Sequence, residues 1–221
     1  MASEPGQLVI SIGYRAHEPH SWQLALREDA LGMGCSVLVA KPMPDYGTYG
    51  PNLRDSVESL RNTIKHPERT VLVSHSLGVA IGLSYAERLA EENKSLKGFV
   101  AVAGFTKHET DFHYLSFYYG NYLLSEFLSE KRDWGRILKA SGGNVAVFHS
   151  DDDPVVNPQQ SAWLADRLGT RPIALRGMRH CDREANVQRI EEIHHVAGNM
   201  LGIMRKEELE KPRMKMAVKT V

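Results

Sequence analysis

The fold of this chain is decided by residues 70–83, which read TVLVSHSLGVAIGL. An apolar run typical of a buried strand passes through a short turn into a small-residue, apolar run that predicts a helix. A chain that changes from strand to helix so quickly must turn sharply, and the central side chain, Ser76, then points away from both elements. The first turn of the helix leaves backbone N–H groups without helical partners beside that serine. An exposed hydroxyl next to such donors is the first candidate for a functional site.

The turn matches the pattern G-x-S-x-G at every position but the first. We expect small residues two before and two after the serine, because these positions crowd each other in so tight a turn. Gly78 supplies the second small residue, and Ser74 stands in place of the first glycine. Ser74 is a small substitute, so the match is weakened but kept. The alternative interpretation of Ser76 is an ordinary serine at the start of a helix.

Length and composition bound the remaining predictions. The chain has 221 residues, enough for one domain with a full core, which we place at residues 1–204 before a basic tail at residues 205–221. Lys and Arg (27) balance Asp and Glu (27), so charge favours neither nucleic acid nor an anionic membrane as a partner. We expect no signal peptide and no membrane helix. Cys35 and Cys181, in no pattern that supports a disulfide, favour a reducing compartment and a cytoplasmic location.

Apolar runs alternate with helical patterns along the chain. The runs predict six strands, at residues 8–12, 35–40, 71–73, 99–103, 145–148 and 172–175. Helices are predicted between them, at residues 22–31, 53–64, 77–91 and 159–168, and along a last apolar stripe from Val187 to Met204. This alternation predicts an α/β fold, with a doubly wound, mainly parallel six-stranded sheet and helices on both faces.

Three kinds of reactive side chain follow three of these strands. Ser76 follows the third strand, three aspartates (residues 151–153) follow the fifth, and His180 follows the sixth. The carboxyl ends of parallel strands meet at one edge of the sheet, where such folds place their ligands. A serine hydroxyl needs an imidazole to take its proton, and that imidazole needs a carboxylate to fix its tautomer. The order therefore predicts a Ser-His-Asp triad, with Asp153 favoured as the acid and Asp152 as the alternative.

These segments resemble the α/β-hydrolase superfamily over nearly the whole predicted domain. Two details are more particular: residues 43–45, Met-Pro-Asp, after the second strand, and residues 152–154, Asp-Asp-Pro, after the fifth. Both are similar to the small serine hydrolases of the retinoblastoma-binding-protein type and their bacterial, YdeN-like relatives. The resemblance implies that Ser76 is the nucleophile, Asp153 the acid and His180 the base.

Such a hydrolase also holds a negatively charged oxygen with two backbone N–H groups. The first is predicted at Leu77, directly after the nucleophile, and the second at Tyr14, in the loop after the first strand. That loop is usually rich in glycine in the superfamily, whereas here it reads Gly-Tyr-Arg-Ala-His from residue 13. Gly13 and His75 are predicted to contribute to the substrate site.

About half of the aromatic residues fall in one insertion after the fourth predicted strand, residues 105–134. We interpret the insertion as a short cap that faces the nucleophile, in which Phe105, Phe112 and Tyr118 wall the substrate pocket. Alternatively, the rings only anchor the insertion to the sheet, or they form an interface for a homodimer or a protein partner.

The leading hypothesis is a serine hydrolase of small esters, thioesters or amides, with an acyl substrate as its partner and with neither metal nor cofactor. One alternative uses the same site for lyase, cyclase or acyl-transfer chemistry, because this fold hosts several reactions. Another is a protein-binding member with little activity, although the motif L-x-C-x-E, tied to that role, does not occur around either cysteine. Cys181 has no second base to activate it, and His194 is expected to be a structural helix residue.

Overall fold

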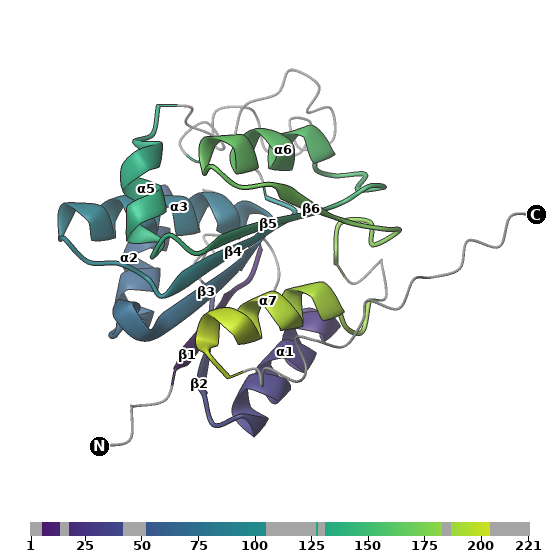
Figure 1. Cartoon of the computed structure of the whole chain (residues 1–221), viewed down its shortest axis with the longest axis horizontal. Coiled ribbons are helices and arrows are strands. Elements are labelled where there is room, and N and C mark those ends of the chain that lie inside the picture. Colours follow the sequence, from purple (N-terminus) through teal and green to yellow (C-terminus); the bar gives the residue numbers. More distant parts are fainter. Residues whose placement is uncertain are drawn as a thin grey trace, which may run out of the picture.

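A six-stranded sheet runs through the part of the chain that the computed structural model describes, which is residues 6–13, 18–41, 52–104, 127, 131–182 and 187–203. All neighbouring strands are parallel, in the order β2-β1-β3-β4-β5-β6 (Figure 1). The strands are β1 (Gln7–Ser11), β2 (Ser36–Ala40), β3 (Thr70–His75), β4 (Gly98–Val102), β5 (Val145–Ser150) and β6 (Pro172–Leu175). The chain winds outward from β1 to β2 and then returns to β3 on the other side, so the predicted doubly wound parallel sheet is confirmed.

Helices cover both faces of the sheet (Figure 1). One face carries α1 (Ser21–Gly32) and α7 (Glu191–Leu201). The other face carries α2 (Leu53–Thr63), α3 (Leu77–Glu91), α5 (Trp134–Ala140) and α6 (Pro158–Arg167), and a short 3-10 turn, η2 (Pro67–Arg69), precedes β3. Asparagines begin two of these helices by accepting a backbone hydrogen bond: Asn52 accepts from Asp55 and Asn157 accepts from Gln159.

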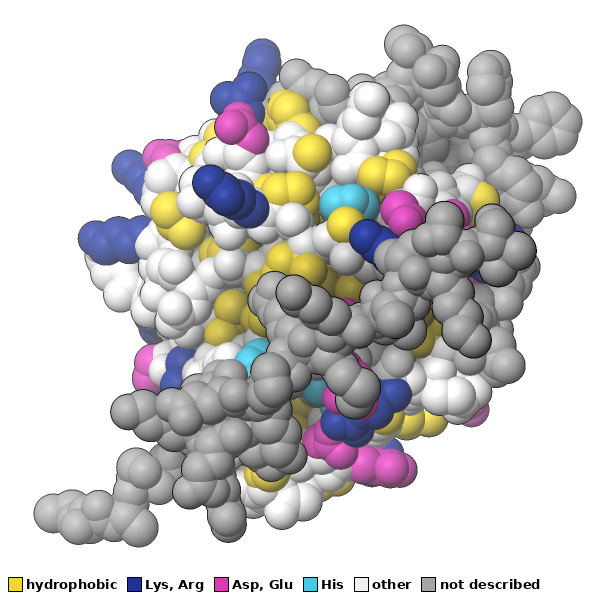
Figure 2. All heavy atoms as spheres, turned by 45° about the vertical axis from the view of Figure 1, so that its right-hand side comes forward, with side chains coloured by type: hydrophobic (Ala, Val, Ile, Leu, Met, Phe, Trp, Pro, Cys, Tyr) yellow, Lys and Arg dark blue, Asp and Glu magenta, His cyan; other side chains and the backbone are white. Residues whose placement is uncertain are grey.

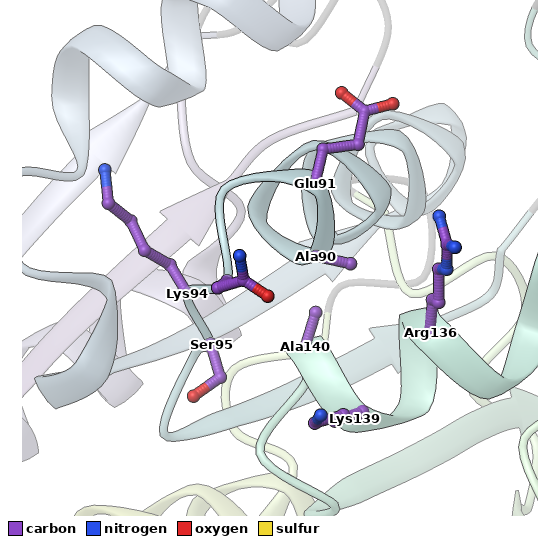
Figure 3. A pocket seen from close by; sticks show the side chains of 8 residues that line it. Ala90, Glu91, Lys94, Ser95, Arg136, Lys139 and Ala140 are labelled. Carbon is purple, nitrogen blue, oxygen red and sulfur yellow. The ribbon is translucent and has the colours of Figure 1, made fainter.

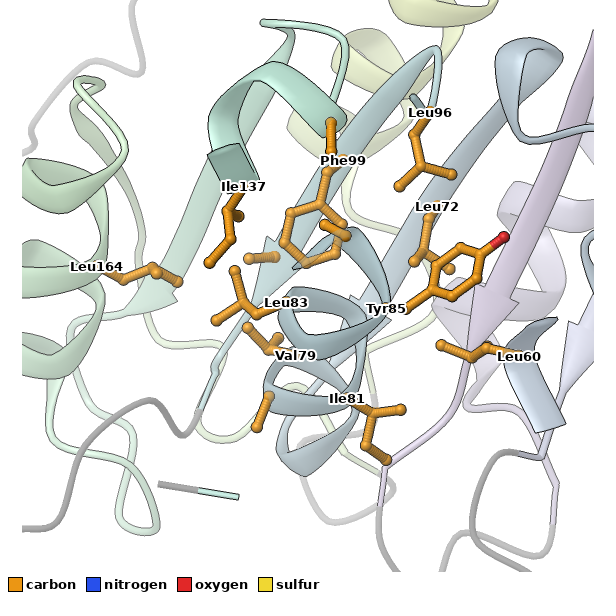
Figure 4. Packing of buried hydrophobic residues seen from close by; sticks show 14 of the residues in the cluster. Leu60, Leu72, Val79, Ile81, Leu83, Tyr85, Leu96, Phe99, Ile137 and Leu164 are labelled. Carbon is orange, nitrogen blue, oxygen red and sulfur yellow. The ribbon is translucent and has the colours of Figure 1, made fainter. Parts of the chain in front are cut away.

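Each face of the sheet has its own apolar cluster. Along β3, Leu72 belongs to the cluster under α3, whereas Val71 and Val73 belong to the cluster under α1 and α7. Successive strand residues point to opposite faces, so a continuous apolar strand feeds both clusters. Figure 4 shows Phe99 of the sheet beside Leu83 of α3, and Leu72 of the sheet beside the ring of Tyr85 of α3. Burial of each such side chain stabilises the fold by about 1.5–3 kcal/mol.

The structure departs from the sequence predictions at three places. Helix α5 was not predicted, because the aromatic insertion was expected to run to Trp134. Trp134 is instead the first residue of α5, and its ring packs edge-on against that of Trp163, with 5.3 Å between the ring centroids. Helix α7 begins at Glu191, later than the apolar stripe from Val187 predicted. Ile190 belongs to the stripe because it is buried, but its backbone is extended and not helical. Leu38 is 38 % exposed although both faces were expected to be covered, because β2 is an edge strand with one neighbour.

The molecular surface in Figure 2 mixes Lys and Arg with Asp and Glu side chains among the residues coloured there. Among the helices that the structure describes, every one is too short or too polar to cross a membrane.

Candidate active site

The nucleophile turn, residues 74–78, joins β3 to α3 in a strained conformation. Ser76 has φ 56° and ψ −129°, a backbone region that side chains with a Cβ rarely adopt. Its N–H donates to the carbonyl of Val102 at 2.9 Å, and its carbonyl accepts from the N–H of Val79 at 3.0 Å. The Ser76 hydroxyl does not cap the helix, so it is free to face another group.

Crowding in this turn has a different source from the one that the motif predicts. A Cβ on Gly78 would lie 3.2 Å from the backbone oxygens of Ser11 and Ile12 at the end of β1, which are the nearest obstacles there. The hydroxyl of Ser74 instead lies against Gly82, one turn further along α3, where a Cβ would come within 2.9 Å of it. Ser74 therefore replaces the first glycine because Gly82 leaves room for its hydroxyl.

A chain of hydrogen bonds links the three predicted triad residues. The Ser76 hydroxyl lies 3.0 Å from Nε2 of His180, and Nδ1 of His180 lies 2.9 Å from Oδ2 of Asp153. For His180 to accept from the serine and donate to the carboxylate, the proton of the neutral ring must be on Nδ1. Ser76 is 8 % exposed and His180 is 7 % exposed, so the contact is largely screened from water. This arrangement can move a proton from a serine to an imidazole.

Asp153 is the aspartate that faces the histidine. Its side chain is 1 % exposed, and its Oδ1 also accepts from the backbone N–H groups of Val155 and Val156 at 2.8 and 2.9 Å. These bonds fix the orientation of the carboxylate. Asp152, the alternative acid, instead accepts from the hydroxyl of Ser150 and the N–H of Arg179, and these bonds lower its carboxyl pKa.

His75 is buried against His180 and faces protein groups. Its Nε2–H donates to the backbone carbonyl of His180 at 2.8 Å, and its ring packs between the rings of His20 and His180, with Trp22 beside it. The residue is 2 % exposed, and burial lowers its pKa well below the usual range, helped by the neighbouring His180 and His20. These contacts make His75 a neutral support of the histidine rather than a surface group that faces a ligand.

The predicted oxyanion donors are described in part. Leu77 is the first residue of α3, so its N–H has no partner within the helix. Gly13 lies against Ser76, since a Cβ on Gly13 would come within 3.1 Å of the Cβ of Ser76. The other predicted site residues lie outside the described part of the chain: Tyr14, Phe105, Phe112 and Tyr118.

Two supporting residues were missed by the sequence analysis. The indole N–H of Trp22 donates to the carbonyl of Cys181, the residue directly after His180, at 2.8 Å. The hydroxyl of Ser150 accepts from the N–H of Met178 at 2.9 Å. Neither residue lies in a recognisable sequence pattern. The only signals are that Trp22 lies in the first turn of α1 and that Ser150 is the last residue of β5, at the edge of the sheet that carries the site.

Other reactive side chains have structural surroundings. Cys35 and Cys181 are free and buried, and burial raises the pKa of the Cys181 thiol to about 12. His194 is buried and bonds Asp29 of α1 at 2.7 Å, as expected for a structural helix histidine. Among the described residues, no three His, Cys, Asp or Glu side chains gather into a metal-binding group.

Comparison with known proteins identifies the family. The family model for serine hydrolases matches residues 8–198. The chain belongs to the serine hydrolase family. Its structure is similar to that of the ydeN gene product from B. subtilis, with a TM-score of 0.74 and 25% sequence identity over 89% of this chain and 99% of that one.

More distant structures share the fold of this serine hydrolase. Est1E from Butyrivibrio proteoclasticus has a TM-score of 0.62 and 17% identity over 90% of this chain and 88% of its own. The type II thioesterase BorB from the borrelidin biosynthetic cluster has a TM-score of 0.52 and 15% identity over 91% of this chain and 94% of its own. No curated protein matches the sequence significantly. The predicted α/β-hydrolase fold is confirmed.

A pocket of about 420 Å³ lies at the opposite end of α3 from Ser76 (Figure 3). Its lining includes Lys94 and Lys139, beside the C-terminal ends of α3 and α5. Arg136, in the first turn of α5, also lines it and pairs with Asp133 at 3.1 Å. Cations at helix C-termini complement the negative end of the helix dipole. Their presence in this serine hydrolase is therefore explained without a ligand.

Proposed function

We propose that this serine hydrolase cleaves small carboxylic esters, thioesters or amides through an acyl-enzyme on Ser76. The observation that carries the proposal is the continuous hydrogen-bond chain from Ser76 through His180 to Asp153. A serine that only caps a helix does not require a neighbouring imidazole, whereas a serine nucleophile requires one to accept its proton. The strained backbone of Ser76 points the same way, because such strain collects at functional sites.

In the proposed reaction, Oγ of Ser76 attacks the substrate carbonyl while its proton passes to Nε2 of His180. Asp153 holds the opposite ring N–H and stabilises the imidazolium that forms. The backbone N–H groups of Leu77 and Tyr14 stabilise the oxyanion. His180 then returns the proton to the leaving alcohol, thiol or amine as the acyl-enzyme forms. A water molecule, deprotonated by His180, attacks the ester carbonyl, and Ser76 recovers its proton as the acid leaves.

The substrate class is proposed from the insertion that follows β4. Its many aromatic residues, Phe105, Phe112 and Tyr118 among them, favour a small, partly apolar acyl or leaving group. Thioesters stay among the candidates because the fold is shared with BorB, a thioesterase. From the sequence we further propose a cytoplasmic location and catalysis without a metal or cofactor.

The test is covalent labelling with a fluorophosphonate, which reacts with activated serines. Wild type is expected to be labelled, and Ser76→Ala is expected to lose labelling and to lower kcat for 4-nitrophenyl butyrate by about 10⁶-fold. Ser74→Ala is the matched control, because Ser74 is a buried serine two residues away and is expected to keep both. Labelling that persists in Ser76→Ala would rule out this nucleophile. Labelling of Ser76 without turnover of any ester, thioester or amide would favour non-hydrolytic chemistry at the same site.

A further inference from the structure

Two segments far apart in the sequence are joined residue by residue beside the triad. The acid turn, residues 150–153, ends β5, and the histidine loop, residues 176–181, follows β6. Each of the four acid-turn side chains bonds one of four successive loop residues. The pairs are Asp151 with the N–H of Gly177 (2.9 Å), Ser150 with the N–H of Met178 (2.9 Å), Asp152 with the N–H of Arg179 (2.8 Å) and Asp153 with the ring of His180.

Asp152 is the centre of this arrangement. Its Oδ1 accepts from the N–H of Arg179 and also from the hydroxyl of Ser150, at 2.7 Å. The same hydroxyl accepts from the N–H of Met178. Oδ1 of Asp152 therefore binds the N–H of Arg179 directly and the N–H of Met178 through the Ser150 hydroxyl. Hydrogen bonds to an ionised acceptor are stronger than hydrogen bonds between two neutral groups. The bonds to Asp152 therefore contribute strongly to the position of the histidine loop.

The histidine loop needs such support because its backbone is strained. Arg179 has φ 45° and Cys181 has φ 53°, so residues with side chains occupy the left-handed region on both sides of His180. Such backbone is less favourable for a residue with a Cβ than ordinary backbone, so surrounding contacts must stabilise it. Below the loop, His75 and Trp22 hold the carbonyls of His180 and Cys181. Above it, Arg179 is exposed and Asp152 holds its N–H.

We propose that Asp152 is a positioning residue for the catalytic base, acting through the backbone of Arg179 and through Ser150. This inference rests on the proposed function, in which His180 is the base. Asp153 orients the ring of His180, whereas Asp152 fixes the backbone from which that ring projects. A carboxylate that would otherwise be a solvated member of an acidic turn therefore controls the distance between Nε2 and the Ser76 hydroxyl.

The experiment compares Asp152→Ala, Asp152→Asn and Asp133→Ala in the full-length protein. Asp133 is a matched control: it is also an exposed aspartate that accepts a backbone N–H, that of Arg136 at 3.0 Å, but it caps α5. Asp152→Ala is expected to lower kcat for 4-nitrophenyl butyrate by about 10- to 100-fold with little change in KM, because a misplaced base costs the chemical step and not binding. Asp152→Asn keeps an acceptor oxygen and is expected to restore kcat to within about threefold of wild type. Asp133→Ala is expected to keep the wild-type kcat.

A second measurement does not depend on turnover. The Nδ1–H of His180, bonded to Asp153, is expected to give a far-downfield proton resonance that disappears in Asp152→Ala and persists in Asp152→Asn. If the wild-type protein turns over no ester, thioester or amide, the proposed function is refuted. Loss of the resonance in Asp152→Ala would still support the positioning role in that case. A wild-type kcat and an intact resonance in Asp152→Ala, or equal losses in Asp133→Ala, would overturn the role of Asp152.

Discussion

The nucleophile turn and the histidine loop meet at one site but are built by opposite means. The nucleophile turn is one continuous segment, held by backbone hydrogen bonds to Val102 and Val79 and by close backbone approach at Gly78. The histidine loop is held by side chains that come from the acid turn after β5, from α1 and from the turn before α3. Both carry residues with positive φ, so both need support, and they obtain it from different sources.

This difference decides how each region responds to substitution. A turn held by its own backbone is disturbed when a substitution adds volume. A loop held by side chains from other segments of the chain is disturbed when a substitution removes a polar group. Substitutions of equal size should therefore affect stability in the first region and turnover in the second.

Among substitutions that leave Ser76 in place, the largest effect is expected in the acid turn. Asp153→Asn should lower kcat by about 10⁴-fold, because the amide cannot hold His180 in the tautomer that accepts a proton from serine. Asp151→Asn should change kcat little, since its amide oxygen still accepts from the N–H of Gly177. Steady-state kinetics with 4-nitrophenyl butyrate measures both. Equal losses would mean that the acid turn acts only as structure and that Asp153 has no separate part in catalysis.

The same contrast explains how much the sequence could predict. The strand positions and the order Ser76, Asp153, His180 followed from local patterns, because an apolar run and a tight turn each show in a few adjacent residues. Helix α5 was hidden, since Trp134 belongs by composition to the aromatic insertion and by structure to the core.

The bonds of the acid turn could not be predicted in the same way. Three adjacent aspartates look like a solvated turn, and their partners are backbone N–H groups in a segment 26 or more residues away. A backbone N–H is present at nearly every residue, so nothing in the sequence marks the ones that are used. Geometry alone shows that Asp152 faces Arg179 while Asp153 faces His180.

The next effect is expected where α3 packs against the nucleophile turn, at Gly82. Gly82→Ala would place a Cβ 2.7 Å from the ring of Phe99 and 2.9 Å from the hydroxyl of Ser74. Such overpacking should destabilise the fold by about 1–3 kcal/mol, measured by urea unfolding. Gly32→Ala is the control, because a Cβ at the end of α1 meets nothing within 4 Å. Equal stability of the two variants would show that the close approach at Gly82 does not constrain the turn.

The smallest effect concerns His75, which belongs to the nucleophile turn in sequence and supports the histidine loop in space. Burial keeps its pKa far below the usual value, so the native ring stays neutral while the unfolded chain takes up a proton below about pH 6.5. Because the unfolded state then binds more protons, stability should fall as the pH drops below about 6.5, by at most about 1.4 kcal/mol per pH unit from this residue. His75→Gln can still donate to the carbonyl of His180 but does not titrate, so urea unfolding between pH 5 and 7 should show a shallower slope. His66→Gln, which replaces a histidine whose side chain is 55% exposed, should keep the wild-type slope. An unchanged slope in His75→Gln would mean that the ring takes up its proton in the native state, and that the two regions are not joined through a neutral imidazole.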